Sequence, residues 1–170
     1  MEKKQVILSI DGATKTGWAV YKNGEIMKHG TKKFNPDKRA FQYGKWLGRM
    51  IGEYGITHIA AEDIFREHNR TQDKAFLALA KMQGVLEYVA NESGAGLALL
   101  NPLQVKGYMI PSFNRLDRGN DKVRMVARVK GLGYQLKTDK ADDEADAIGI
   151  MITYLANNRI PVTHPKSQRQ

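Results

Sequence analysis

The chain has 170 residues, 42% of them hydrophobic, which is enough for one domain with a proper core and too little for two. Cysteine is absent, which excludes disulfide frameworks, thiolate nucleophiles and cysteine-based zinc sites, so any metal must bind to oxygen or histidine ligands. Lys and Arg number 27 against 18 Asp and Glu, a formal net charge of +9. This excess favours a polyanionic partner, nucleic acid above all, over the alternative that the charge only keeps the protein soluble.

Membrane and export signals are missing from the sequence. It contains no run of about 18 apolar residues, and its charged N-terminus leads into an apolar stretch without a secretory pattern. We therefore expect a cytoplasmic protein that has no contact with membranes.

The first part of the chain predicts three strands. Residues 5–11 form a short apolar run that ends in an acid, as in a buried strand. Residues 17–22 and 25–32 flank Asn23-Gly24, a pair that favours a type I′ turn because both positions tolerate positive φ. The second and third strands should therefore form a hairpin.

From residue 40 onward, helices alternate with strands. Apolar residues recur at helical spacing over 40–54, and 58–62 returns to the strand pattern. Residues 71–91 predict a long helix, and 96–100 predict a fifth strand. This order predicts an α/β domain with a mixed five-stranded sheet flanked by helices.

The last part of the chain predicts three more helices and a tail. Pro102 suits the first turn of a helix that residues 105–110 could carry, and two further helices are expected over 121–130 and 141–157. Residues 159–170 contain two prolines and no periodicity. We therefore expect a single domain over 1–158, followed by a basic, flexible tail.

Four acids can meet in such a fold. Asp11 and Glu62 stand at the ends of apolar strands, where side chains can converge on a ligand at the edge of an α/β sheet. Asp143 and Asp146 lie three residues apart near the start of the last helix, and so share one face of it. Asp142, four residues before Asp146, competes with Asp143 for this role.

Each acid also has an ordinary structural explanation. Asp11 precedes Gly12 and could begin a turn, and the helical pair could act as a cap, because carboxylates gain from the dipole of a helix N-terminus. Their combination argues otherwise, since four neighbouring carboxylates repel one another unless a cation joins them. Oxygen ligands without cysteine select Mg²⁺ or Mn²⁺, and two such ions about 4 Å apart can support phosphodiester hydrolysis.

The motifs around these acids occur in the order seen in RuvC-type Holliday-junction resolvases. They read Ser9-Ile-Asp-Gly-Ala-Thr-Lys-Thr-Gly-Trp18, Ala61-Glu-Asp-Ile-Phe65 and Asp143-Glu-Ala-Asp-Ala147. The predicted helix over 69–90, with Lys81-Met-Gln-Gly84, is similar to that family's dimer-region helix. The resemblance covers nearly the whole chain, to about Asn157.

The resemblance implies an RNase H-like fold and a structure-selective endonuclease that resolves Holliday junctions, with other branched DNA as a further candidate substrate. The implied tetrad of catalytic metal ligands is Asp11, Glu62, Asp143 and Asp146, and the family's Asp-x-x-Asp-Ala spacing selects Asp143 over Asp142. The implied cofactor is Mg²⁺, two ions per site, with Mn²⁺ as a substitute. A homodimer would present two such sites to a four-way junction, and the resemblance names no branch-migration partner.

One departure from the family pattern concerns the segment from Asp11 to Thr16-Gly17, which is one residue shorter than in many cellular resolvases. We interpret the chain as a divergent member of phage type. Such a protein would act in the cytoplasm of the host cell.

Basic and aromatic residues supply the expected DNA contacts. By resemblance, Lys106 and Lys122 face the scissile phosphates, and Lys122 joins the catalytic group because a lysine beside metals can neutralise charge on the phosphate. Phe65 matches an aromatic that contacts bases at the branch point, although core packing is an equal use for any Phe. Further basic residues, each of which could instead be ordinary surface, are expected to grip phosphates: Arg66, Arg70, Lys74, Arg115, Arg118 and Arg124.

Three other functions compete with junction resolution. A related nuclease acting on RNA or on flaps would use the same acids. An actin-like phosphate-binding ATPase lobe also carries Asp, Gly and Thr after its first strand, but it needs a second lobe for which this chain is too short. An inactive DNA-binding module is disfavoured by the presence of all four acids.

Overall fold

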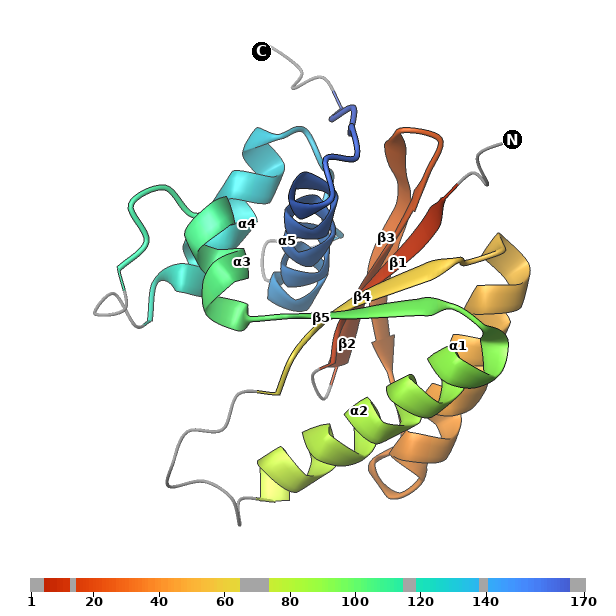
Figure 1. The fold of residues 1–170 in the computed structure, drawn as a ribbon. Helices are drawn as coiled ribbons and strands as arrows, with labels where there is room; N and C mark the ends of the chain where they lie inside the picture. Colours follow the sequence, from red (N-terminus) through yellow and green to blue (C-terminus); the bar gives the residue numbers. More distant parts are fainter. Residues whose placement is uncertain (1–4, 13–14, 65–73, 115–118, 138–140, 166–170) are drawn as a thin grey trace.

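Five strands form one mixed sheet. They are β1 (Val6–Asp11), β2 (Lys15–Lys22), β3 (Glu25–Lys33), β4 (His58–Glu62) and β5 (Gly96–Leu100). Their order in the sheet is β3-β2-β1-β4-β5; the first three are antiparallel neighbours, whereas β4 and β5 run parallel to β1. This computed structural model describes residues 5–12, 15–64, 74–114, 119–137 and 141–165 (Figure 1).

Helices cover both faces of the sheet, with a hydrophobic core under each layer (Figure 1). One face carries α1 (Arg39–Tyr54), which follows the 3-10 helix η1 (Pro36–Lys38), and α2 (Lys74–Ser93). The other carries α3 (Pro102–Met109), α4 (Asp121–Gly131) and α5 (Asp142–Asn157). Within the described ranges, no helix combines the length and the apolar character needed to cross a membrane.

Side chains of β1 alternate between the two cores. Leu8 and Ile10 belong to the core beneath α1 and α2, whereas Ile7 belongs to the core beneath α5. Ser9 is fully buried on the same face as Ile7, and its Oγ donates a hydrogen bond of 2.7 Å to the carbonyl oxygen of Ala147 in α5. The odd-numbered residues of β1 therefore face α5.

The expected mixed five-stranded sheet flanked by helices is confirmed. Asn23 and Gly24, between β2 and β3, both have positive φ, 56° and 89°, as the predicted hairpin turn requires. The helix α3 begins at Pro102, the residue expected in its first turn, and the Asn101 side chain caps it by accepting a hydrogen bond of 2.9 Å from the Leu103 amide. The start of the long helix predicted from residue 71 falls outside the described residues, and α2 is described from Lys74.

Part of the segment expected as a tail, residues 159–165, is described, and it contacts the domain. The Tyr21 hydroxyl of β2 donates a hydrogen bond of 2.8 Å to the carbonyl oxygen of Pro161. Ile160 and Val162 pack, partly buried, against the core beneath α5. This segment docks as an irregular chain, and periodicity cannot predict such docking because it detects only regular elements.

Candidate active site

Asp11 and Glu62 end two neighbouring parallel strands. The register of β1 and β4 pairs Ile10 with Ala61, so the next residue of each strand is one of the two acids. In β4, Ala60 belongs to the core beneath α5, and alternation therefore turns Glu62 toward the face that Asp11 also occupies. Sheet register alone thus brings both carboxylates to one edge, under α5.

Gly17 explains how closely α5 approaches this edge. It is the β2 partner of Asp11, and a Cβ atom at this position would lie 1.7 Å from the carbonyl oxygen of Asp143 and 3.2 Å from the Cβ atom of Ala147. The first turn of α5 therefore rests directly on the backbone of β2. This contact brings Asp143 and Asp146 toward the end of β1.

The four acids influence one another electrostatically. Burial raises the pKa of Asp11 well above its ordinary value, and the negative charges of Asp146, Glu62 and Asp143 raise it further. Burial also raises the pKa of Asp146 to about 7, with Glu62 as the next cause. Burial raises the pKa of Glu62 as well. Carboxylates from β1, β4 and α5 therefore share one poorly hydrated space, which favours either protonation or a bound cation.

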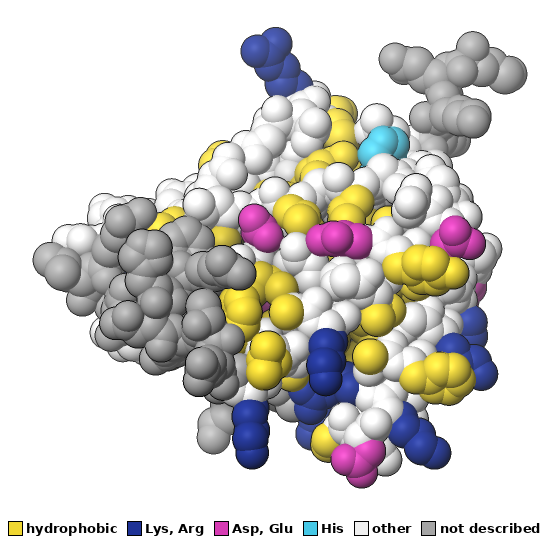
Figure 2. All heavy atoms as spheres, turned by 60° about the horizontal axis from the view of Figure 1, so that its bottom comes forward, with side chains coloured by type: hydrophobic (Ala, Val, Ile, Leu, Met, Phe, Trp, Pro, Cys, Tyr) yellow, Lys and Arg dark blue, Asp and Glu magenta, His cyan; other side chains and the backbone are white. Residues whose placement is uncertain are grey.

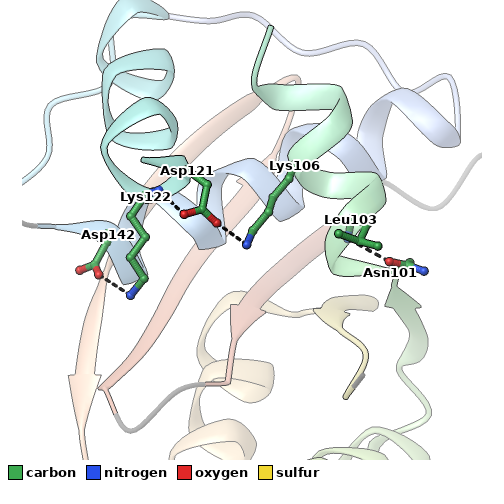
Figure 3. A network of polar contacts seen from close by, with 6 residues as sticks. All are labelled: Asn101, Leu103, Lys106, Asp121, Lys122 and Asp142. Atoms are coloured by element: carbon green, nitrogen blue, oxygen red, sulfur yellow. Dashed lines mark hydrogen bonds and ion pairs between the residues drawn. The ribbon is translucent and has the colours of Figure 1, made fainter. Parts of the chain in front are cut away.

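Two lysines near these acids are bonded to aspartates outside the predicted tetrad (Figure 3). The Nζ atom of Lys106 in α3 lies 2.5 Å from Oδ2 of Asp121, and the Nζ atom of Lys122 in α4 lies 2.8 Å from Oδ2 of Asp142. Burial raises the pKa of Glu62 against the opposing charge of Lys106, and the charge of Lys122 likewise opposes the upward shift of the Asp11 pKa. Both ammonium groups therefore act on the acidic cluster while each is bonded to a carboxylate outside the predicted tetrad.

Asp142 and Asp143 lie in different surroundings. The hydrogen bond from Lys122 lowers the pKa of Asp142, whose side chain is 30% exposed. Burial raises the pKa of Asp143, whose side chain is 17% exposed and whose Oδ2 lies 3.7 Å from Nζ of Lys15. Asp142 is thus occupied by a lysine, whereas Asp143 is the more buried of the two and acts on Asp11.

The acidic cluster suits a hard divalent cation by the chemistry of its donors, since carboxylate oxygens are the ligands that Mg²⁺ and Mn²⁺ prefer. Within the described part of the chain, no three His, Asp or Glu side chains are close enough to hold a metal ion as they stand. The acids nevertheless act on one another, because their negative charges contribute to the raised pKa values of Asp11 and Asp146. A cation bound among them would offset that repulsion.

A cavity of about 280 Å³ lies beside Asp11 and Glu62, on the side of the sheet covered by α1 and α2. Arg39, Tyr43 and Gln83 contribute to its lining. The Arg39 Nε atom is buried and has no hydrogen-bond partner among the described residues. Burial and the charge of Asp11 raise the pKa of Tyr43, so this wall of the cavity lies within electrostatic reach of the acids.

The remaining predicted DNA contacts are spread over the surface or lie outside the described residues. Lys74, the first residue of α2, lines a second cavity of about 390 Å³ whose lining includes none of the four acids. Arg124 of α4 donates a hydrogen bond to the carbonyl oxygen of Pro111. Five predicted residues fall outside the described ranges: Phe65, Arg66, Arg70, Arg115 and Arg118.

Sequence reasoning missed three residues that the structure places at the site: Gly17, Lys15 and Asp121. Gly17 carried a signal, since it stands within the first motif, but its contact with α5 is tertiary. Asp121 stands directly before Lys122 at a helix start, where an acid is expected for the helix dipole alone. No sequence pattern predicts its contact with Lys106, which lies 15 residues away on another helix.

Known proteins resemble this chain over almost its whole length, although no protein-family model matches it. The crossover junction endodeoxyribonuclease RuvC of Campylobacter jejuni (strain 81116) is 28% identical over 165 residues, which cover 92% of this chain and 99% of the relative. The crossover junction endodeoxyribonuclease RuvC of Clostridioides difficile (strain 630) is 26% identical over 167 residues, which cover 93% of this chain and 94% of the relative.

Solved structures of RuvC and of a further resolvase have a fold similar to that of this chain. Thermus thermophilus RuvC in complex with a Holliday junction substrate has a TM-score of 0.70 at 20% identity, covering 95% of this chain and 99% of that one. The yeast mitochondrial Holliday junction resolvase Ydc2 has a TM-score of 0.60 at 16% identity, and the match covers 89% of this chain and 78% of that one. The expected RNase H-like architecture is therefore confirmed.

Proposed function

We propose that this chain, which is RuvC-type in sequence and fold, is a structure-selective endodeoxyribonuclease that resolves four-way DNA junctions. The observation that carries the proposal is the meeting of acids from β1, β4 and α5 at one edge of the sheet in a protein of net charge +9. An acidic cluster on a basic protein suits a cation-assisted reaction on a polyanion. We assign the nuclease domain to residues 1–158 and its site of action to the cytoplasm.

We assign the metal ligands to Asp11, Glu62, Asp143 and Asp146. When bound there, Mg²⁺ supplies Lewis-acid activation of water and of the phosphodiester, and the acidic cluster has enough carboxylates for two ions, with Mn²⁺ as a substitute. The protein contributes the rigid placement of its carboxylates, since two end adjacent strands and two lie on one helix seated against β2. Sequestration beneath α5 keeps these groups poorly hydrated, which strengthens their hold on a cation.

The two lysines complement the acids. Carboxylates alone would repel a phosphodiester, whereas Lys106 and Lys122 offer positive charge on the same side of the cluster. We assign both to the scissile phosphate, where an ammonium group offsets the negative charge that grows in the transition state. The exposed side chain of Lys122, 65% accessible, can leave Asp142 for an incoming phosphate.

Two copies of the chain are needed to cut two strands symmetrically, and we assign the contact between them to α2. Leu77 and Tyr88, eleven residues apart and thus on one side of the helix, are 48% and 65% exposed. Lys81 and Gly84 lie between them on the same stripe and are also exposed. Figure 2 shows the molecule with the bottom of Figure 1, where α1 and α2 lie, turned forward, and hydrophobic side chains are exposed there among basic and acidic ones. A twofold axis along this stripe would give the isologous contact of a homodimer.

The test is cleavage of matched substrates in Mg²⁺: a labelled four-way junction, a three-way junction, a flap, a duplex and an RNA–DNA hybrid of the same sequence. We expect paired nicks at symmetric positions of the four-way junction and little cutting of the duplex. The Asp146→Asn variant is the matched control for contaminating nuclease. Cutting restricted to the hybrid or to the flap would show that the chain is the related nuclease and not a junction resolvase. If no substrate is cut, both the junction-resolving and the related nuclease activity are refuted.

A further inference from the structure

A single carboxylate, that of Asp121, contacts both lysines that flank the acidic cluster (Figure 3). Its Oδ2 atom accepts a hydrogen bond of 2.5 Å from Nζ of Lys106, and its Oδ1 atom accepts one of 3.1 Å from the backbone amide of Lys122. Lys106 belongs to α3, whereas Asp121 and Lys122 begin α4. Asp121 therefore links the two helices at the point where their lysines approach the acids.

Lys106 has two sets of negative groups within its reach. Its ammonium group is bonded to Asp121, yet its charge also opposes the rise that burial causes in the pKa values of Glu62 and Asp146. A free lysine side chain samples many rotamers, and holding one in place costs up to about 2 kcal/mol of conformational entropy. The Asp121 contact, whose two side chains are only 33% and 20% exposed, holds the ammonium group before any substrate arrives.

Removing Asp121 would leave Glu62 and Asp146 as the carboxylates that act on this ammonium group. An ammonium group that moved between them would take the position that a metal ion needs, and it would no longer meet the phosphate. Lys122 would be affected less, because its own ammonium group is held separately by Asp142. Lys106 must therefore lie near the acidic cluster to meet the phosphate. Its ammonium group must also be restrained, so that it does not occupy the position of the metal ion.

We propose that Asp121 is a positioning residue, which holds the ammonium group of Lys106 at the edge of the acidic cluster, ready for a phosphate and out of the place of the metal ion. This inference rests on the metal-binding role proposed for the four acids. It assigns to a residue outside the tetrad a role in metal affinity, which a plain helix-capping function does not predict.

The test measures the Mg²⁺ affinity of the free protein, from the rise in its melting temperature as Mg²⁺ is added without DNA. The Asp121→Asn variant keeps an acceptor for the Lys122 amide but loses the charge that holds Lys106. We expect its half-saturating Mg²⁺ concentration to rise on the order of tenfold, which corresponds to about 1.4 kcal/mol. Adding Lys106→Ala to this variant should abolish the rise, because no ammonium group then competes for the acids.

Two further variants separate positioning from structure and from net charge. Asp121→Glu keeps the carboxylate and should restore most of the Mg²⁺ affinity. Glu53→Gln, an exposed position at the end of α1, makes the same change in net charge and should leave the Mg²⁺ affinity as in the wild type. Unfolding without Mg²⁺ shows whether each variant is folded.

Single-turnover cleavage of a four-way junction completes the cycle. Asp121→Asn and Lys106→Ala should each slow cleavage on the order of tenfold at saturating Mg²⁺, and the double variant should be no slower than Lys106→Ala. Independent, multiplying effects would overturn the positioning role, as would a Mg²⁺ affinity of Asp121→Asn equal to that of the wild type. If Mg²⁺ failed to stabilise even the wild type, the proposed metal site would fall, and this inference with it.

Discussion

Gly17 in β2 lies directly against the carbonyl group of Asp143 in α5, where a Cβ atom would fall 1.7 Å from the carbonyl oxygen. The atom it would meet belongs to the backbone, so no rotamer change can relieve the clash. The closeness of this contact sets the height of α5 above the sheet. The position of two of the four acids thus depends on a residue that has no side chain.

Gly17→Ala should therefore destabilise the protein by about 3 kcal/mol, since α5 must shift to admit the methyl group. Cleavage should fall further than stability explains, because the shift carries Asp143 and Asp146 away from Asp11. Gly48→Ala is the matched control, since no atom lies within 4 Å of its added Cβ in the exposed face of α1. That variant should gain up to about 1 kcal/mol from helix propensity in urea unfolding. Equal effects of both substitutions would disprove the close packing at Gly17.

A second prediction concerns a buried hydrogen bond between side chains of distant elements. Nδ1 of His29 in β3 lies 2.6 Å from Oε1 of Glu144 in α5, whose side chain is 1% exposed. His29→Leu would leave the Oε1 atom of this buried carboxylate without a partner, while Oε2 keeps its hydrogen bond of 3.2 Å from the Lys137 amide, at a cost of about 3 kcal/mol. The double variant His29→Leu/Glu144→Leu removes the charge as well and should recover most of the loss in urea unfolding. If it is no more stable than the single variant, an unpaired buried charge is not the cause.

The sequence predicted those features of the site that depend on local pattern. Alternation and strand ends placed Asp11 and Glu62, and the three-residue spacing placed Asp143 and Asp146 on one helical face. These inferences needed only the period of each element. In the structure Asp146, Glu62 and Asp143 act electrostatically on Asp11, and the metal-binding role of the four acids remains a prediction.

What the sequence could not predict depends on contacts between distant residues. The His29–Glu144 pair spans 115 residues, and nothing near either residue indicates the other. Asp121 looked like an ordinary first-turn acid because its lysine partner lies on another helix. The contacts of residues 159–165 could not be predicted either, because hydrogen bonds to an irregular chain create no periodicity.

The pKa of Asp146 leads to a prediction for the metal-free protein. Burial raises this pKa from 3.8 to about 7, so the folded state favours the protonated carboxyl group. The stability that this group contributes is therefore complete below pH 3.8 and is lost as the pH rises through about 7. Asp146→Asn cannot ionise and should exceed the wild type by about 2–4 kcal/mol at about pH 8 without divalent cations. Urea unfolding in EDTA at several pH values measures this difference.

Asp142→Asn is the control for Asp146→Asn, and its stability should change in the opposite direction. Lys122 lowers the pKa of Asp142, so the stability from Asp142 is present above its ordinary pKa and is lost as the pH falls through the lower folded value. Asp142→Asn should therefore be less stable than the wild type at about pH 8. Added Mg²⁺ should stabilise the wild type and leave Asp146→Asn unaffected. A loss of stability in metal-free Asp146→Asn at this pH would contradict the raised pKa.

The adjacent aspartates at the start of α5 should differ in their effect on cleavage. Asp143→Asn should slow single-turnover cleavage by on the order of a hundredfold or more, whereas Asp142→Asn should slow it by less than about tenfold, through Lys122 alone. The reason is the difference in surroundings, since Asp143 acts on Asp11 and Asp142 is bonded to Lys122. The reverse order of rates would transfer the proposed ligand role to Asp142.

Recognition of junctions should depend strongly on salt and weakly on base sequence, because the four arms of a junction offer many phosphates but few base edges to one small domain. If about six phosphates are neutralised, the affinity should fall on the order of a thousandfold between about 50 and 200 mM salt. Lys122→Ala and Arg118→Ala should each reduce the slope of log Kd against log salt by about one phosphate contact. Binding isotherms in the Asp146→Asn background measure these slopes on uncut DNA.

Phe65→Ala is the contrasting variant in the same salt series. Stacking of an aromatic ring on a base releases no counterions, so this variant should keep the slope of its parent while cleavage or opening of the branch point decreases. Cleavage by Phe65→Ala is compared with cleavage by the wild type. Its DNA binding is measured in the inactive Asp146→Asn background and compared with that of Asp146→Asn alone. Unchanged slopes for both basic variants, together with a flattened slope for Phe65→Ala, would reverse the roles assigned to charge and stacking.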